Sequence, residues 1–155
     1  MANTFKELPL AEITLRKYEK PSAENERDLV KKFCLSLGLL QPGDSRDIII
    51  DILLILLKSE KPVKSDELRE KVIEYRKLMN LPLTGIAHSN IRRQLLRLKN
   101  LYLIEKKRDG YRITENTSLK EILLQRIKPI LLEQTYNRIL EYAETIDKNI
   151  RKCAE

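Results

Sequence analysis

The segment Ile48–Leu57 reads IIIDILLILL and is apolar except for Asp51. As a helix, it would present apolar side chains in nearly every direction around its axis. Its length is about half of the roughly 20 residues that a bilayer span requires. We therefore expect a central helix enclosed by other elements in a globular core, and the remaining segments have to supply those elements.

Amphipathic helices are predicted on both sides of this segment. The preceding helix carries apolar residues at i, i+4 and i+8 and ends near Gly38, and the following helix fades by Asn80. A connection containing Pro82 leads to a further helix from about Ile86 to Asn100. The candidate N-caps of the first three helices are, in order, Ser22, Asp44 or Ser45, and Ser65.

The helix from about Ile86 to Asn100 has two different faces. Ile91, Leu95 and Leu98 recur at i, i+4 and i+7, which predicts that they face inward. At 100° per residue, the opposite face collects Ile86 together with the polar or cationic residues Ser89, Asn90, Arg93 and Arg97.

A basic hairpin is predicted after this helix. Glu105–Arg108 leads into Asp109-Gly110, a dipeptide typical of tight hairpin turns, and Tyr111–Thr114 returns as the second strand. Of the formal charge of +7, the window 88–112 carries +6, with 8 basic and 2 acidic residues. Segments 1–21, 22–87 and 113–155 carry +1, 0 and 0. Such a concentration of positive charge is typical of a surface that docks on a phosphate backbone.

The segment SNIRRQLLRLKNLYLIEKKRDGYRIT, residues 89–114, resembles the third helix and wing of winged helix-turn-helix regulators, broadly the MarR, ArsR and PadR groups. Many members of these groups are prokaryotic repressors. The element order of residues 44–114 extends the resemblance, although the connection at 80–85 is longer than the usual 3 to 4 residues. The matching positions are Leu95, Leu98, Leu101, Ile104, Asp109, Gly110, Tyr111 and Thr114.

The resemblance and the charge together predict binding to double-stranded DNA. Arginine can donate two hydrogen bonds to guanine, and asparagine can pair with adenine, so Asn90, Arg93 and Arg97 are expected to read bases. Ser89 and Arg92 are expected at the edge of the groove, and the hairpin cations at phosphates or in a minor groove. The predicted DNA-binding residues are Ser89, Asn90, Arg92, Arg93, Arg97, Lys106, Lys107, Arg108 and Arg112.

The C-terminal segment is predicted to be a helical dimerisation extension. Ser118 and Glu121 have the spacing of a capping box, and Pro129 is expected to break or kink the helix that follows. A narrow heptad seam favours pairing with a second copy; the alternative is packing against the helix that Ser22 caps. The seam consists of Leu132, Tyr136, Ile139, Ala143, Ile146 and Ile150.

The expected fold is mainly α with a small β-hairpin wing, a winged helix-turn-helix with a C-terminal helical extension. We expect an extended N-terminal arm at 1–21, a helix and turn at 22–43, the winged helix at 44–114 and the extension at 115–155. Catalytic motifs are missing around the single His88, and Cys34 and Cys153 lie in no metal-binding pattern, so neither an enzyme nor a cofactor or metal is expected.

These features predict a cytoplasmic homodimer without a membrane partner. It is expected to bind double-stranded DNA in a sequence-specific manner and to regulate transcription as a repressor. The alternative is a winged-helix protein-interaction module, a non-enzymatic subunit of a larger assembly, whose basic surface meets an acidic protein.

Overall fold

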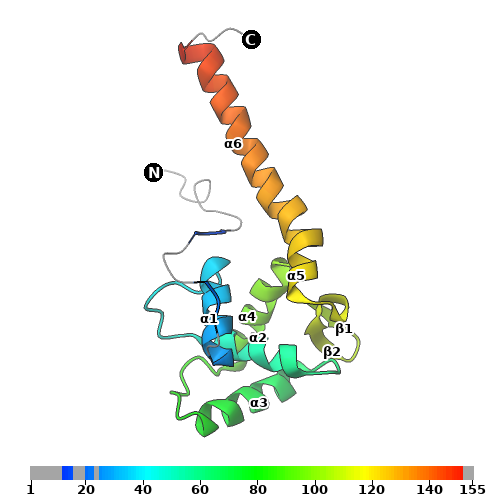
Figure 1. Ribbon diagram of the computed structural model, residues 1–155. Helices are drawn as coiled ribbons and strands as arrows, with labels where there is room; N and C mark the ends of the chain where they lie inside the picture. Colours follow the sequence, from blue (N-terminus) through cyan, green and yellow to red (C-terminus); the bar gives the residue numbers. More distant parts are fainter. Residues whose placement is uncertain (1–11, 16–19, 23–24, 152–155) are drawn as a thin grey trace. The chain divides into compact units, whose positions relative to one another are not determined.

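The computed structural model describes residues 12–15, 20–22 and 25–151. The described chain is mainly helical with a two-stranded antiparallel hairpin, a layout compatible with a winged helix, and this confirms the expected fold class at that level (Figure 1). The chain divides into an N-terminal unit, residues 1–117, and a C-terminal unit, residues 118–155. Residues 22–43 therefore belong to the same unit as 44–114, and the C-terminal unit begins three residues later than the sequence predicts.

Helix α2, Ile48–Lys58, is the centre of the N-terminal unit. It contacts α1 (Glu26–Ser36), α3 (Ser65–Leu78), α4 (His88–Asn100) and strand β2 (Gly110–Ile113), which surround it in Figure 1. Eight of its eleven residues are buried. The prediction of an enclosed central helix is confirmed.

The helix starts differ from the predicted ones. Asn25, rather than Ser22, caps α1, because its side chain accepts a hydrogen bond from the Asp28 N–H at 2.9 Å. Asp47 and Lys64 occupy the N-cap positions of α2 and α3, and neither side chain caps its helix. Helix α4 begins at His88 instead of Ile86, since the chain is still extended at Ala87. Most of the predicted arm lies outside the described residues, but the Thr14 N–H donates to the Ser36 carbonyl at 3.0 Å.

Four buried or half-buried charges join α1, α2 and α3. The carboxylate of Asp51, which is 0% exposed, accepts hydrogen bonds from Arg76 and from Nε of Arg27, the latter at 2.9 Å. Asp47 pairs with the same two guanidinium groups, at 2.8 Å and 3.1 Å. Burial alone would raise the pKa of Asp47, but the hydrogen bonds and charges of the two arginines outweigh it and lower that pKa. We call these four residues the core ion network.

The long connection between α3 and α4, residues 79–87, is held at three of its carbonyl groups. Nε of Arg76 donates to the Pro82 carbonyl, and Nε of Arg69 donates to the Ile86 carbonyl, both at 2.6 Å. The amide of Asn90 donates to the Gly85 carbonyl at 2.6 Å. These bonds fix the start of α4 although the connection is longer than a usual helix-turn-helix turn.

The hairpin consists of β1, Ile104–Lys107, and β2 in antiparallel register, with Lys107 opposite Gly110. Its turn is therefore Arg108-Asp109, one residue earlier than predicted. Val63 and Tyr111 exchange two backbone hydrogen bonds of 2.8 Å. This bridge joins the hairpin to the segment that precedes α3, and nothing in the sequence pattern predicts it.

Gly110 is expected to be required for this bridge. A Cβ atom there would lie 2.5 Å from the Val63 carbonyl oxygen and 2.7 Å from the Lys64 nitrogen. Because backbone atoms must shift to admit it, we expect Gly110→Ala to lower the free energy of unfolding by about 1–3 kcal/mol in urea titrations. Gly43 is the control, since it also has a positive φ but nothing lies within 4 Å of its Cβ position. Equal losses in the two variants would attribute the effect to φ and reject the close approach.

The C-terminal unit is a continuous helical run. It comprises α5 (Leu119–Ile122), a π-helical stretch (Leu123–Leu132), α6 (Glu133–Ile146) and a second π-helical stretch (Asp147–Arg151). As predicted, the Ser118 hydroxyl accepts from the Glu121 N–H, at 3.2 Å. Of the two outcomes predicted at Pro129, a break is wrong, because the residue lies within the π-helical stretch and the helical run continues through it into α6. Among the described helices, none is both long and apolar enough to cross a bilayer.

Candidate nucleic-acid interface

Helix α4 places a polar and basic arc at the surface of the N-terminal unit. Ile91, Leu95 and Leu98 are buried as predicted, and Asn90 and Gln94 are buried with them. The buried arc is therefore wider than the apolar periodicity indicates, because it also includes Asn90 and Gln94. The exposed arc is correspondingly narrower than predicted and does not contain Asn90. The exposed arc contains His88, Ser89, Arg92, Arg93, Leu96, Lys99 and Asn100.

Asn90 is only 8% exposed, which corrects its assignment to the exposed face. In addition to its bond to Gly85, its side-chain oxygen accepts from Arg93 at 2.9 Å and from Gln94 at 3.0 Å. The amide expected to read adenine is used inside the protein. Its role in the structure is to hold the connection against α4.

Arg97 is also placed differently from the prediction. Its guanidinium donates to the Gln94 side chain at 2.8 Å and contacts the carbonyl of Gly38, after α1, at 3.4 Å. It is half-buried at the margin of the helix, whereas Arg92 and Arg93 are exposed. The structure thus brings Ser89, Arg92 and Arg93 together on one exposed face, with Arg93 hydrogen-bonded to the buried Asn90 beneath it, and leaves Arg97 at the margin of that face.

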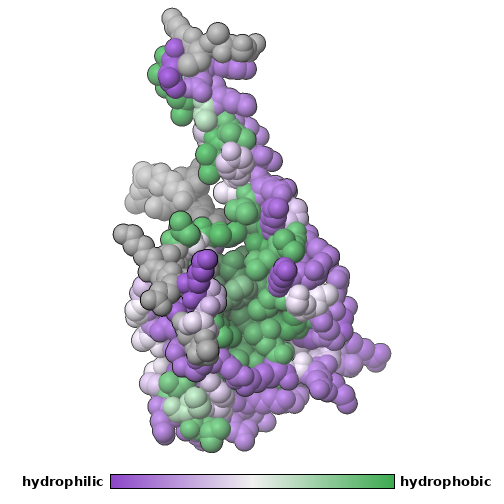
Figure 2. All heavy atoms as spheres, viewed as in Figure 1, coloured by the Kyte–Doolittle hydropathy of each residue, from purple (hydrophilic) through white to green (hydrophobic). Residues whose placement is uncertain are grey.

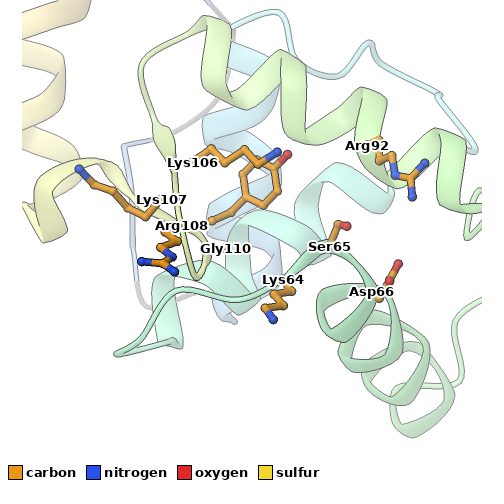
Figure 3. A pocket seen from close by; sticks show the side chains of 9 residues that line it. Lys64, Ser65, Asp66, Arg92, Lys106, Lys107, Arg108 and Gly110 are labelled. Carbon is orange, nitrogen blue, oxygen red and sulfur yellow. The ribbon is translucent and has the colours of Figure 1, made fainter.

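A hollow of about 390 Å³ lies between the start of α3, the exposed arc of α4 and the hairpin (Figure 3). Five cationic residues and one acidic residue contribute to its lining, so the surface around it is strongly positive. We call it the basic hollow; its lining residues are Lys64, Ser65, Asp66, Arg92, Lys106, Lys107, Arg108, Gly110 and Tyr111.

The hairpin cations point to different sides. Lys106 extends over the ring of Tyr111, with its Nζ 5.8 Å from the ring centroid, and Figure 3 shows it on the side toward α4. Lys107 and Arg108 point to the opposite side of the hairpin in the same view. Alternation along a strand explains the different directions of Lys106 and Lys107. Positive charge therefore lies on both faces of the hairpin.

Arg112 is the hairpin cation most closely paired within the sheet, and Lys107 pairs more loosely with the same Glu105 carboxylate, at 3.7 Å. Nε of Arg112 donates to Glu105 at 2.7 Å, and the same carboxylate oxygen accepts from the Glu115 N–H at 3.1 Å. Burial alone would raise the pKa of Glu105, but these hydrogen bonds and the nearby Lys107 lower it. Glu105 is therefore ionised at neutral pH and offsets the charge of Arg112.

Lys64 and Ser65, at the start of α3, are members of the basic hollow that the sequence analysis missed. The Val63–Tyr111 bridge brings this helix start to the hairpin. The first N–H groups of α3 add a partial positive charge there. Nδ1 of His88 lies 3.3 Å from the Asp66 carboxylate, so the lone histidine joins the starts of α3 and α4.

Leu96 is the second feature that the sequence analysis missed. It lies on the exposed arc of α4 and is 54% exposed. The signal available in the sequence was that Leu96 falls outside the i, i+4, i+7 set of the inward face. It gives the otherwise polar arc an apolar contact point beside Arg92 and Arg93.

The predicted dimer seam lies entirely at the surface. No residue of α6 is buried, and all six seam side chains are exposed, with Ile139 at 59%. Figure 2 shows hydrophobic residues along one side of this helix and hydrophilic residues along the other. Within the described part of the C-terminal unit, residues 118–151, nothing covers the seam, and the choice between a second copy and the helix near Ser22 stays a prediction.

The described residues form neither a metal-binding site nor a reactive thiol site. They contain no group of three or more histidine, cysteine or acidic residues that could hold a metal ion. Cys34 is a free, fully buried cysteine, and burial raises its pKa to about 12, so the thiol stays protonated at neutral pH. Cys153 lies outside the described residues.

Neither a protein-family model, nor a curated protein, nor a solved structure matches this chain.

Proposed function

We propose that this protein is a winged-helix, sequence-specific binder of double-stranded DNA that regulates transcription, acting as a homodimeric repressor. The observation that carries the proposal is the basic hollow beside the exposed arc of α4. An α-helix fits the major groove, and a basic hairpin and a helix start beside it are suited to the flanking phosphates.

The charges of the surface are exposed, although Arg93 also donates to Asn90 at 2.9 Å and Lys107 lies 3.7 Å from the Glu105 carboxylate. Arg92, Lys106, Lys107 and Arg108 belong to the basic hollow, and Arg93 and Lys99 extend the positive surface along α4. Arg112 is already paired with Glu105 and contributes less. Neutralising phosphates with exposed cations of this kind releases counterions, which supplies most of the sequence-independent affinity for DNA.

Base reading is assigned to Arg92, Arg93 and Leu96. The two arginines can each donate two hydrogen bonds to guanine O6 and N7, and Leu96 suits the methyl group of thymine. Asn90 and Arg97 act as positioning residues, since their side chains hold α4 to the rest of the N-terminal unit.

Replacing Arg93 or Arg92 by Ala tests this assignment. On a duplex selected from a random library, each loss is expected to cost about 1–3 kcal/mol of binding free energy and to relax base preference at one position. Fluorescence anisotropy measures both effects. Arg138→Ala is the control, because Arg138 is an exposed arginine in the C-terminal unit. Equal losses on selected and random DNA would show a phosphate contact and reject base reading by that residue.

The dimer is assigned to the exposed seam of α6. Replacing Ile139 and Ile146 by Asp puts two carboxylates on the seam, and sedimentation is expected to show monomers with unchanged helical circular dichroism. The control replaces Gln134 and Thr145 by Asp, which adds the same charge on the other side of the helix. If the seam variant remains a folded dimer, the seam is not the interface.

A further inference from the structure

We infer that the seam of the C-terminal helix pairs with a second copy of itself in antiparallel orientation. The two-fold axis crosses the pair at the level of Glu141 along the helix, midway between Ile139 and Ala143. The inference rests on the homodimer of the proposed function and adds the partner's direction. It follows from the sizes of the seam side chains and from the residues that flank them.

The antiparallel register matches large residues with smaller ones. It places Tyr136 against the partner's Ile146 and Ile139 against the partner's Ala143, and the outer layer joins Leu132 to the partner's Ile150. The layer volumes are then more even than in a parallel pair, and the smallest layer, Ile139 with the partner's Ala143, still contains one large side chain. The two inner layers lie wholly within α6, where the helix is regular.

The parallel register fits worse. It would oppose Tyr136 to the partner's Tyr136 in one layer and Ala143 to the partner's Ala143 in another. The first layer is overfilled, and the second leaves a void where no side chain reaches. Uneven layers of this kind oppose a parallel pair.

The residues that flank the seam favour the same direction. In the antiparallel pair, Leu140 lies beside the partner's Leu140 and Tyr142 beside the partner's Tyr142, so these side chains, 41% and 66% exposed in one copy, cover each other. In a parallel pair, Leu140 would face the partner's Thr135 and Tyr142 the partner's Asp147. Leu140 and Tyr142 would then remain exposed to solvent.

The charged residues that flank the seam slightly favour the parallel pair. The antiparallel pair brings Glu133 near the partner's Asp147, whereas the parallel pair would bring Lys128 near the partner's Glu133. Such exposed charges are screened by water and salt and contribute little. The packing of the layers therefore decides the direction.

The direction also sets the distance between the two Ser118 residues. In the antiparallel pair, the two Ser118 residues lie at opposite ends of the coil, roughly 65–70 Å apart at 1.5 Å per residue. In a parallel pair they would be about 10 Å apart.

Disulfide trapping tests the direction without DNA. In a Cys153→Ser background, Tyr136→Cys and Ile146→Cys are prepared separately and then mixed, with subunit exchange before oxidation by diamide. Cys34 remains, since it is buried and its raised pKa keeps it protonated. We expect covalent dimers in the mixture and in Leu140→Cys alone, and none in Tyr136→Cys alone.

The outcomes separate the inference from the proposed function. The antiparallel direction would be overturned if Tyr136→Cys alone formed covalent dimers and the mixture formed none between the two variants. The homodimer itself would still stand. A monomer in sedimentation of the unmodified protein would overturn both. DNA binding is measured separately, so its loss would refute the proposed function without touching the helix pairing.

Discussion

Replacing Asp51 by Ala is expected to lower the free energy of unfolding by about 3–5 kcal/mol, because it removes the shared partner of two arginines in a buried ion network. Asp51 is 0% exposed, and its carboxylate pairs with Arg27 and Arg76, of which Arg76 is 1% exposed. Its removal leaves two guanidinium groups sharing only Asp47. A loss of this size is a large part of the about 5–15 kcal/mol that stabilises a typical domain.

Urea unfolding followed by circular dichroism measures the loss. Asp51→Asn keeps the volume and removes the charge, so it separates the uncompensated arginines from the cavity that Ala creates. Glu74→Ala is the control, an exposed carboxylate on α3, the helix that carries Arg76, and it is expected to change stability by less than about 0.5 kcal/mol. A similar small change in Asp51→Ala would show that the core ion network does not join the three helices.

Elements governed by local pattern were predictable from the sequence. The apolar run of α2 demands enclosure, the inward face of α4 follows its 3.6-residue period, and Asp109-Gly110 indicates the hairpin to within one residue. Each of these predictions depends on residues close together in the chain. The class of fold follows from them.

Features that depend on partners far along the chain were not predictable. Asp51 stands out in its apolar helix, but its partners Arg27 and Arg76 lie 24 and 25 residues away. Asn90 looks like a surface residue until the Gly85 carbonyl is placed beside it. Lys64 reaches the basic hollow only through the Val63–Tyr111 bridge. A prediction from residue polarity alone therefore placed Asn90 and Arg97 on the exposed face of α4, where the structure does not have them.

The second large effect is on the salt dependence of DNA binding. A dimer presents two basic hollows, and if together they neutralise roughly 6–10 phosphates, the affinity falls by about 10³ to 10⁵ between 50 and 200 mM salt. The double variant Lys106→Gln, Lys107→Gln is expected to flatten the slope by roughly one unit for each lost contact, equally for all DNA sequences. The fold is retained because both side chains are exposed on the hairpin.

A matched variant distinguishes these contacts from a general effect of charge. Lys120→Gln with Lys128→Gln removes the same two charges from exposed positions in the C-terminal unit. It is expected to leave the slope nearly unchanged. An equal flattening in both double variants would show that net charge, and not the basic hollow, governs the interaction.

The affinity of the unmodified protein for a random 30-base-pair duplex, followed by fluorescence anisotropy from 50 to 200 mM salt, tests whether the basic hollow binds a phosphate backbone. The account predicts binding at low salt that weakens by about three to five orders of magnitude over this range. Absence of salt-sensitive DNA binding by the folded protein would contradict it and would favour a winged-helix module whose basic surface meets an acidic protein.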